Sequence, residues 1–121
     1  MTVAATVLVV EDEPLIRWTI AEDLRDAGFT VVEAANADDA IKCLIDNRQI
    51  SVVFTDIDMP GSMDGLKLAE FVRDRWPPIR IIVTSGNWRG ADVALLETER
   101  FLTKPYDSKI VARTISQLVL G

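Results

Sequence analysis

Histidine is absent from this chain of 121 residues. Its absence excludes imidazole catalysis, zinc sites built on histidine, and a role as a phosphohistidine donor. Cysteine occurs once, as Cys43, so an internal disulfide is impossible and a reducing, cytoplasmic location is expected. The longest strongly apolar run, Val7–Val10, is far too short to span a membrane. No basic segment precedes an apolar stretch at the N-terminus, so no signal peptide is expected.

Positive charge is also scarce. The chain has 13 Lys and Arg residues against 19 Asp and Glu residues, which gives a formal net charge of −6. This balance argues against direct binding of nucleic acid through a general basic surface. Hydrophobic residues make up 49% of the chain, and its length suits one domain over residues 1–121 with no output domain. The available chemistry is that of carboxylates, hydroxyls, amines and hard metal ions.

Short apolar runs alternate with helical patterns. Four continuous runs are typical of strands buried on both faces of a sheet. They are Val7–Val10, Val52–Phe54, Ile79–Val83 and Phe101–Leu102. A fifth run, Phe29–Glu33, is interrupted by polar residues, which favours an edge strand.

The segments between these runs show helical spacing. Ile16, Ile20 and Leu24 define the predicted buried face of the first helix, which Gly28 ends. Three further helices have predicted N-caps, at Asn36, Asp64 and Asp107.

One helical segment is weak. Gly86 and Gly90 interrupt it, and only Ala91 to about Glu99 is expected to form a short helix. Strands alternating with helices predict an α/β fold, a three-layer doubly wound (βα)₅ domain with helices on both faces of a parallel sheet.

Polar side chains follow most of the predicted strands: Glu11 and Asp12, then Asp56 and Asp58, then Ser85, then Lys104. Ligands of open α/β sheets bind outside the carboxyl ends of the strands, so these side chains are expected to converge. Three clustered carboxylates repel one another unless cations neutralise them. Lys104 supplies one positive charge, and a divalent ion supplies two more. Oxygen ligands select Mg²⁺, Mn²⁺ or Ca²⁺, and one or two carboxylates with waters suit Mg²⁺ best.

The same groups suit a phosphoryl group. Magnesium beside a carboxylate, a hydroxyl and a lysine is a common way to hold one. Asp56 is the candidate nucleophile, because aspartate forms acyl phosphates. Ser85 is a candidate hydrogen-bond donor to one phosphoryl oxygen, and Lys104 is a candidate partner for another.

Four motifs in this order resemble those of the receiver domains of two-component response regulators, over essentially the whole chain. They are VLVVEDEP (7–14), TDIDMPGSMDG (55–65), IIVTSG (81–86) and FLTKPY (101–106). The resemblance implies a flavodoxin-like fold whose five parallel strands have the order 2-1-3-4-5. It also implies a function: a histidine kinase or a phosphorelay phosphorylates the domain, which then binds its downstream protein partner differently.

The resemblance also implies roles for single residues. Asp56 is the phosphoacceptor, and Lys104 pairs with the phosphate and precedes a cis bond to Pro105. Ser85 is the switch hydroxyl and Phe101 the switch aromatic.

The metal ligands follow in the same way. The resemblance implies that Asp12 is the direct ligand of Mg²⁺ and that Glu11 acts mainly through water. It makes the backbone carbonyl of Asp58 a third protein ligand. The side chain of Asp58 is either simply exposed or acts on the water that hydrolyses the acyl phosphate.

The chain departs from the family pattern in two places. Gly61 and Ser62 extend the loop after Asp56, and the stretch from Ser85 to Lys104 is a few residues short. A protein partner is expected to bind around Trp88 and the switch aromatic.

Two other functions fit some of these residues. The Asp56–Asp58 spacing imitates magnesium-dependent phosphohydrolases of the haloacid dehalogenase type, although Met59–Pro60 then departs from their motif. A pseudo-receiver that never takes phosphate is the second alternative.

The receiver interpretation expects no enzyme activity beyond the domain's own phosphorylation and dephosphorylation. It also expects a histidine kinase or histidine phosphotransfer protein as donor, no membrane or nucleic-acid partner, and a monomer or weak dimer. The chain is either a stand-alone receiver or a piece of a longer regulator.

Overall fold

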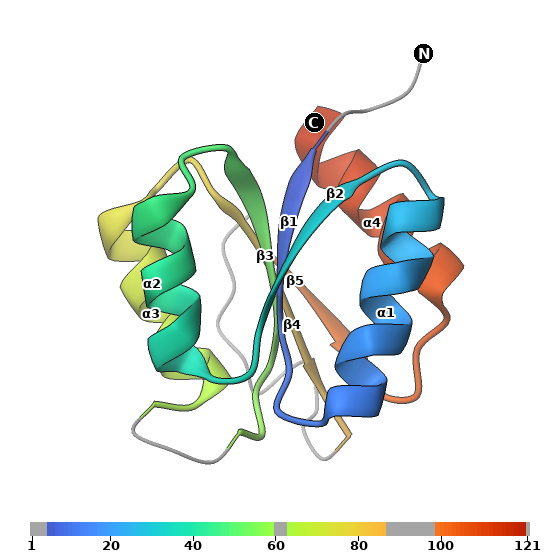
Figure 1. The fold of residues 1–121 in the computed structure, drawn as a ribbon, viewed down its shortest axis with the longest axis horizontal. Coiled ribbons are helices and arrows are strands. Elements are labelled where there is room, and N and C mark those ends of the chain that lie inside the picture. Colours follow the sequence, from blue (N-terminus) through green and yellow to red (C-terminus); the bar gives the residue numbers. More distant parts are fainter. Residues whose placement is uncertain (1–4, 60–62, 87–98, 121) are drawn as a thin grey trace.

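The computed structural model describes residues 5–59, 63–86 and 99–120. Within these ranges strands and helices alternate along the chain (Figure 1). The elements are β1 (Thr6–Val10), α1 (Pro14–Asp26), β2 (Thr30–Ala34), α2 (Ala37–Asp46), β3 (Ile50–Asp56), α3 (Gly65–Arg75), β4 (Arg80–Ser85), β5 (Glu99–Thr103) and α4 (Ser108–Leu120).

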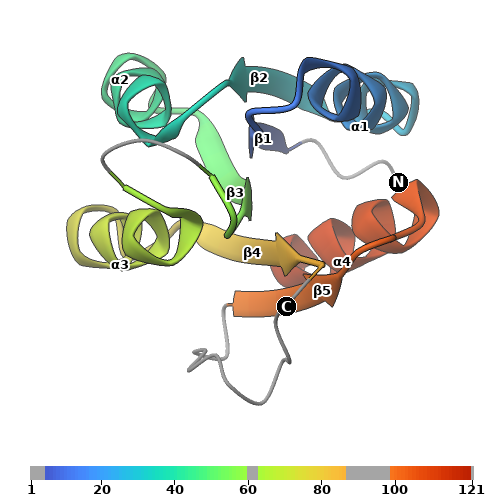
Figure 2. The ribbon, with the colours of Figure 1, turned by 90° about the horizontal axis from the view of Figure 1, so that it is seen from below.

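The strands form one sheet in the order β2-β1-β3-β4-β5, and every neighbouring pair is parallel. This confirms the predicted fold class and strand order, with β2 at an edge. In a parallel sheet all carboxyl ends lie along the same edge, and Figure 2 is drawn from that side. The fold therefore brings together whatever follows each strand.

One hydrophobic core lies on each face of the sheet. Helices α2 and α3 cover one face, and α1 and α4 cover the other (Figure 1). Along β1, Leu8 and Val10 belong to the core under α2 and α3, whereas Val7 and Val9 belong to the core under α1 and α4. Successive strand residues point to opposite faces, so a strand covered on both sides must be apolar throughout. This accounts for the continuous apolar runs of β1, β3 and β4. The prediction that Phe101–Leu102 is buried on both faces is wrong, because β5 is an edge strand and both residues are half-buried.

The predicted helix ends are confirmed. Side-chain oxygens of Asn36, Asp64 and Asp107 accept hydrogen bonds of 2.8–2.9 Å from backbone N–H groups two or three residues ahead. Such caps satisfy donors that have no partner inside the helix. Gly28 follows α1 with a φ of 101°, a conformation that side chains with a Cβ rarely adopt.

Two predictions about individual residues are wrong. Ile16 is 40% exposed, because the buried face of α1 consists of Ile20, Ala21 and Leu24. The first turn of α1 lies beside the carboxyl end of the sheet, where Ile16 borders a groove instead of the core. Glu99 begins β5 and does not end a helix. The rest of the expected short helix, from position 91, lies outside the described residues.

A buried ion pair joins α3 to the start of β5. The carboxylate of Glu99 is 3% exposed and accepts two hydrogen bonds of 2.8 Å from the guanidinium of Arg73. These hydrogen bonds raise the pKa of Arg73, although its own burial opposes the shift. Removing Arg73 would leave the buried carboxylate of Glu99 without its bidentate partner, which is costly.

None of the helices in the described ranges is long and apolar enough to cross a membrane.

Candidate functional site

The ends of four strands position the polar side chains. Asp56 is the last residue of β3 and Ser85 the last of β4, so the strands extend further than their apolar runs suggest. Glu11 follows β1, and its N–H continues the pairing with β2 by donating to the carbonyl of Ala34 at 3.1 Å. Lys104 follows β5, and its N–H donates to the carbonyl of Ser85 at 3.0 Å. The backbone ladder therefore brings these residues to one edge of the sheet (Figure 2).

Lys104 lies between two buried carboxylates. Its Nζ is 2.8 Å from Oδ2 of Asp56 and 3.3 Å from Oε1 of Glu11. Burial lowers the pKa of Lys104, but the hydrogen bond to Asp56 and the charges of both acids outweigh it and leave the pKa raised. The ammonium therefore stays charged and offsets part of the negative charge at this edge.

The acids themselves form a cluster suited to a cation. Carboxylate oxygens of Glu11, Asp12 and Asp56 lie within 4.8 Å of one another. Burial raises the pKa of Glu11, and the nearby carboxylates of Asp12 and Asp56 add to the shift. One ammonium does not balance three carboxylates, so the cluster has the charge and the oxygen donors of a divalent-cation site.

Asp58 contacts both the cluster and Ser85. Its backbone N–H donates to Oδ1 of Asp56 at 3.1 Å. Its carboxylate Oδ2 accepts a short hydrogen bond of 2.6 Å from Oγ of Ser85. Asp58 is exposed, as one of the two sequence-based alternatives had it, and its carboxylate also contacts the hydroxyl that was predicted to act as the switch.

The start of α3 packs directly on the backbone of Asp56. The N–H of Gly65 donates to the carbonyl of Ile57 at 3.0 Å. A Cβ at position 65 would overlap the carbonyl oxygen of Asp56 and lie 2.7 Å from the Cα of Ile57. Only glycine permits this approach, so helix α3 holds the end of β3 in place.

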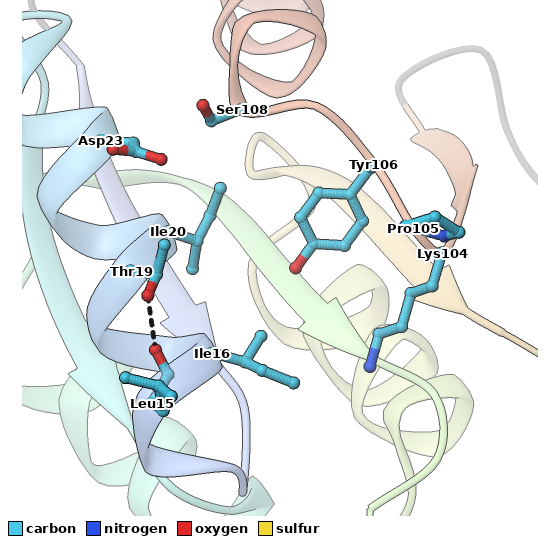
Figure 3. Close-up of a pocket in the computed structure, with 9 residues that line it drawn as sticks. All are labelled: Leu15, Ile16, Thr19, Ile20, Asp23, Lys104, Pro105, Tyr106 and Ser108. Atoms are coloured by element: carbon cyan, nitrogen blue, oxygen red, sulfur yellow. Dashed lines mark hydrogen bonds between the residues drawn. The ribbon is translucent and has the colours of Figure 1, made fainter.

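An apolar groove of about 680 Å³ opens beside the cluster, between α1 and the chain that follows β5 (Figure 3). Its lining residues are Leu15, Ile16, Thr19, Ile20, Asp23, Lys104, Pro105, Tyr106 and Ser108. Leu15 is 71% exposed, so this is an apolar surface open to solvent. The groove was not predicted from the sequence, because helical spacing places Ile16 on the buried face of α1. The signal in the sequence is that Leu15, which lines the groove, lies off the buried face of the helix.

The remaining predicted residues take the following places. The bond between Lys104 and Pro105 is cis, as the resemblance implied. Phe101 is half-buried and packs against the core under α2 and α3. Cys43 is also half-buried there, and its burial raises the pKa of its thiol. Gly61, Ser62 and Trp88 lie outside the described residues.

The sequence profile of one family, described as the response regulator receiver domain, matches residues 7–116. The chain belongs to this family. Its sequence relatives include a putative NtrX-like response regulator of Rickettsia typhi, which is 42% identical over 82 residues, or 67% of this chain. The sensor kinase CckA of Brucella abortus is 33% identical over 120 residues, or 96% of this chain. The receiver domain aligns with only 17% and 13% of the lengths of these two relatives.

Solved receiver structures share the fold. The receiver domain of the hybrid histidine kinase CckA is 30% identical, with a TM-score of 0.80 over 95% of this chain and 99% of that one. A receiver protein of Sinorhizobium medicae is 29% identical, with a TM-score of 0.88 over 98% and 96%. TrrA of Thermotoga maritima, solved with Mg²⁺ and BeF, is 25% identical, with a TM-score of 0.83 over 94% and 98%. This chain is therefore a receiver domain of the two-component type in both sequence and fold.

The contact between Gly65 and Asp56 leads to a first prediction. Gly65→Ala is expected to destabilise the receiver domain by about 1–3 kcal/mol, because the new methyl group meets backbone that must shift. Gly86→Ala is the matched control: among the described residues, the nearest atom to its added Cβ would be Cβ of Lys104, at 3.9 Å. Urea denaturation measures both variants. Equal losses of unfolding free energy would show that the approach of α3 to β3 is not constrained as described.

Proposed function

We propose that residues 1–121 act as one receiver unit whose phosphoacceptor is Asp56. The observation that carries this proposal is the hydrogen bond of 2.8 Å from Lys104 to Oδ2 of Asp56, made inside a cluster with Glu11 and Asp12. An isolated capping or surface aspartate has no such surroundings. Asp56 is 4% exposed, yet it lies at the edge of the sheet where ligands of this architecture bind.

The chemistry follows from the groups around Asp56. A carboxylate oxygen of Asp56 attacks phosphorus, an acyl phosphate bond forms, and the bond from phosphorus to the leaving group breaks with its electron pair. Lys104 offsets negative charge on the phosphoryl oxygens, and the hydroxyl of Ser85 donates a hydrogen bond to one of them. The cycle consists of the domain's own phosphorylation and dephosphorylation.

A magnesium ion fits the donor set at this edge. The cluster offers oxygen ligands and carries more negative charge than Lys104 neutralises. When bound, Mg²⁺ supplies positive charge next to the transferred phosphoryl group. Asp12 would hold it directly, Glu11 mainly through water, and the backbone carbonyl of Asp58 would complete the protein ligands. The related receiver TrrA, solved with Mg²⁺ and BeF, supports this assignment.

The phosphodonor in this proposal is a histidine kinase or a histidine phosphotransfer protein. Residues 1–121 contain no histidine, so the phosphohistidine lies outside this domain. The groove beside α1 offers that protein an apolar surface that ends at Lys104 (Figure 3). Phosphorylation then changes the affinity of the domain for a downstream protein.

Phosphorylation of Asp56 is the second prediction. Acetyl phosphate or phosphoramidate with Mg²⁺ is expected to add one labile phosphoryl group, seen by intact mass spectrometry. Asp56→Asn is expected to abolish it, because an amide does not form the acyl phosphate. Asp64→Asn, which keeps a capping side chain, is the control and should label like the wild type. Labelling of Asp56→Asn would overturn the assignment, and an unlabelled wild type would favour the pseudo-receiver alternative.

The metal gives a third prediction. Mg²⁺ at about 100 times its Kd is expected to raise the free energy of unfolding by about 2.7 kcal/mol, because it binds only the folded cluster. Asp12→Ala is expected to remove most of this stabilisation, whereas Asp107→Asn, which keeps the capping oxygen of α4, should keep it. Thermal unfolding of the wild type and both variants, with and without Mg²⁺, measures the stabilisation of each protein. An unchanged response of Asp12→Ala would mean that Asp12 is not a ligand.

Donor binding at the groove is the fourth prediction. Leu15→Glu is expected to slow transfer from an autophosphorylated histidine kinase by more than about tenfold, because a charge replaces apolar contact area. Labelling by acetyl phosphate should stay unchanged. Ile45→Glu is the matched control, since Ile45 is 60% exposed on α2, across the sheet. If both variants slowed phosphotransfer equally, the donor would not bind at the groove.

A further inference from the structure

The contact between Asp58 and Ser85 has no part in the phosphoacceptor chemistry described so far. The hydroxyl of Ser85 is fully buried and donates to Oδ2 of Asp58 at 2.6 Å. A hydrogen bond this short to a carboxylate is charge-assisted and stronger than one between neutral groups. The two residues lie 27 positions apart, at the ends of neighbouring strands β3 and β4.

Asp58 also contacts the proposed phosphoacceptor. Its N–H donates to Oδ1 of Asp56 at 3.1 Å, so its backbone is anchored to the residue that receives the phosphoryl group. One residue therefore contacts both Asp56, through its backbone, and Ser85, through its side chain. A movement of Asp56 therefore shifts the backbone of Asp58, and with it the carboxylate that accepts the hydrogen bond from Ser85.

The hydroxyl of Ser85 has a single proton to donate. It cannot donate to the carboxylate of Asp58 and to a phosphoryl oxygen on Asp56 at the same time. Phosphorylation also adds negative charge next to the residue that carries this carboxylate, and like charges repel. The competition for the Ser85 proton and the charge repulsion both disfavour phosphorylation of Asp56 as long as Ser85 donates to Asp58.

We propose that the side chain of Asp58 is a latch on Ser85, a positioning residue that holds the switch hydroxyl in its resting arrangement. The proposal rests on the proposed function, in which Ser85 donates to the phosphoryl group on Asp56. When the phosphoryl group is present, the proton stays on Ser85 and its hydrogen bond moves from Asp58 to a phosphoryl oxygen. The hydrogen bond between Ser85 and Asp58 therefore adds to the free energy that is needed to move Ser85 to the phosphoryl group.

The test uses beryllofluoride, a noncovalent phosphoryl mimic, at saturating Mg²⁺. Calorimetry measures its affinity for the wild type, Asp58→Ala, Ser85→Ala and the double variant. Asp58→Ala is expected to bind about tenfold more tightly or better than the wild type, because no hydrogen bond to a charged group has to be broken first. In the Ser85→Ala background the same substitution should have a clearly smaller effect, since the latch is already gone.

Two further variants distinguish the loss of the hydrogen bond to Ser85 from the loss of a negative charge. Asp58→Asn keeps an oxygen acceptor for Ser85 but loses the charge, and is expected to lie between the wild type and Asp58→Ala. Asp64→Asn removes a nearby exposed charge that does not contact Ser85, and its effect should be the same with and without the hydroxyl. An equal effect of Asp58→Ala in both backgrounds would leave only charge repulsion and overturn the latch.

A second measurement needs no phosphoryl mimic. Urea unfolding of the same four proteins without ligand should show coupling between Asp58 and Ser85, with the double variant less destabilised than the sum of the single variants. Additive losses would overturn the latch even if beryllofluoride bound well. Coupling without beryllofluoride binding by the wild type would instead support the latch and count against the proposed function.

Discussion

The ammonium of Lys104 is the charge on which the polar edge of this sheet depends. Three carboxylates meet there, and two of them, Glu11 and Asp56, are almost entirely buried. Carboxylates this close repel one another, and a positive charge among them offsets the repulsion. The N–H of Lys104 donates to the carbonyl of Ser85, and this bond fixes where its side chain begins. The side chain then reaches across the end of β4 to β3 and β1.

Much of this arrangement could be predicted from sequence because two simple rules determine it. Continuous apolar runs identify strands covered on both faces, and the residues that end those strands must share an edge when the sheet is parallel. Asp56, Ser85 and Lys104 come from three separate runs, yet the topology makes them neighbours. The capping residues were equally accessible, since each acts within three residues of its own position.

The features that escaped prediction depend on contacts between distant parts of the chain. Glu99 looked like the end of a helix, and only the structure shows its partner, Arg73, 26 positions earlier. Likewise the carboxylate of Asp58 meets Ser85 27 positions later. Ile16 satisfied the helical spacing of a buried face, but the sheet ends beside it and leaves it on a groove. Local spacing carries no information on where a neighbouring layer stops.

The ion pair between Arg73 and Glu99 has a consequence for how this chain tolerates variation in length. The end of β4 is held by its pairing with β3 and β5, and the start of β5 is tied to α3 through Glu99. Both ends of the intervening segment are thus anchored by residues outside it. The entropic cost of joining two fixed points by a stretch of chain grows only slowly with the number of residues between them. A related chain could gain or lose residues between positions 86 and 99 and still place its lysine in register with the acids of the neighbouring strands.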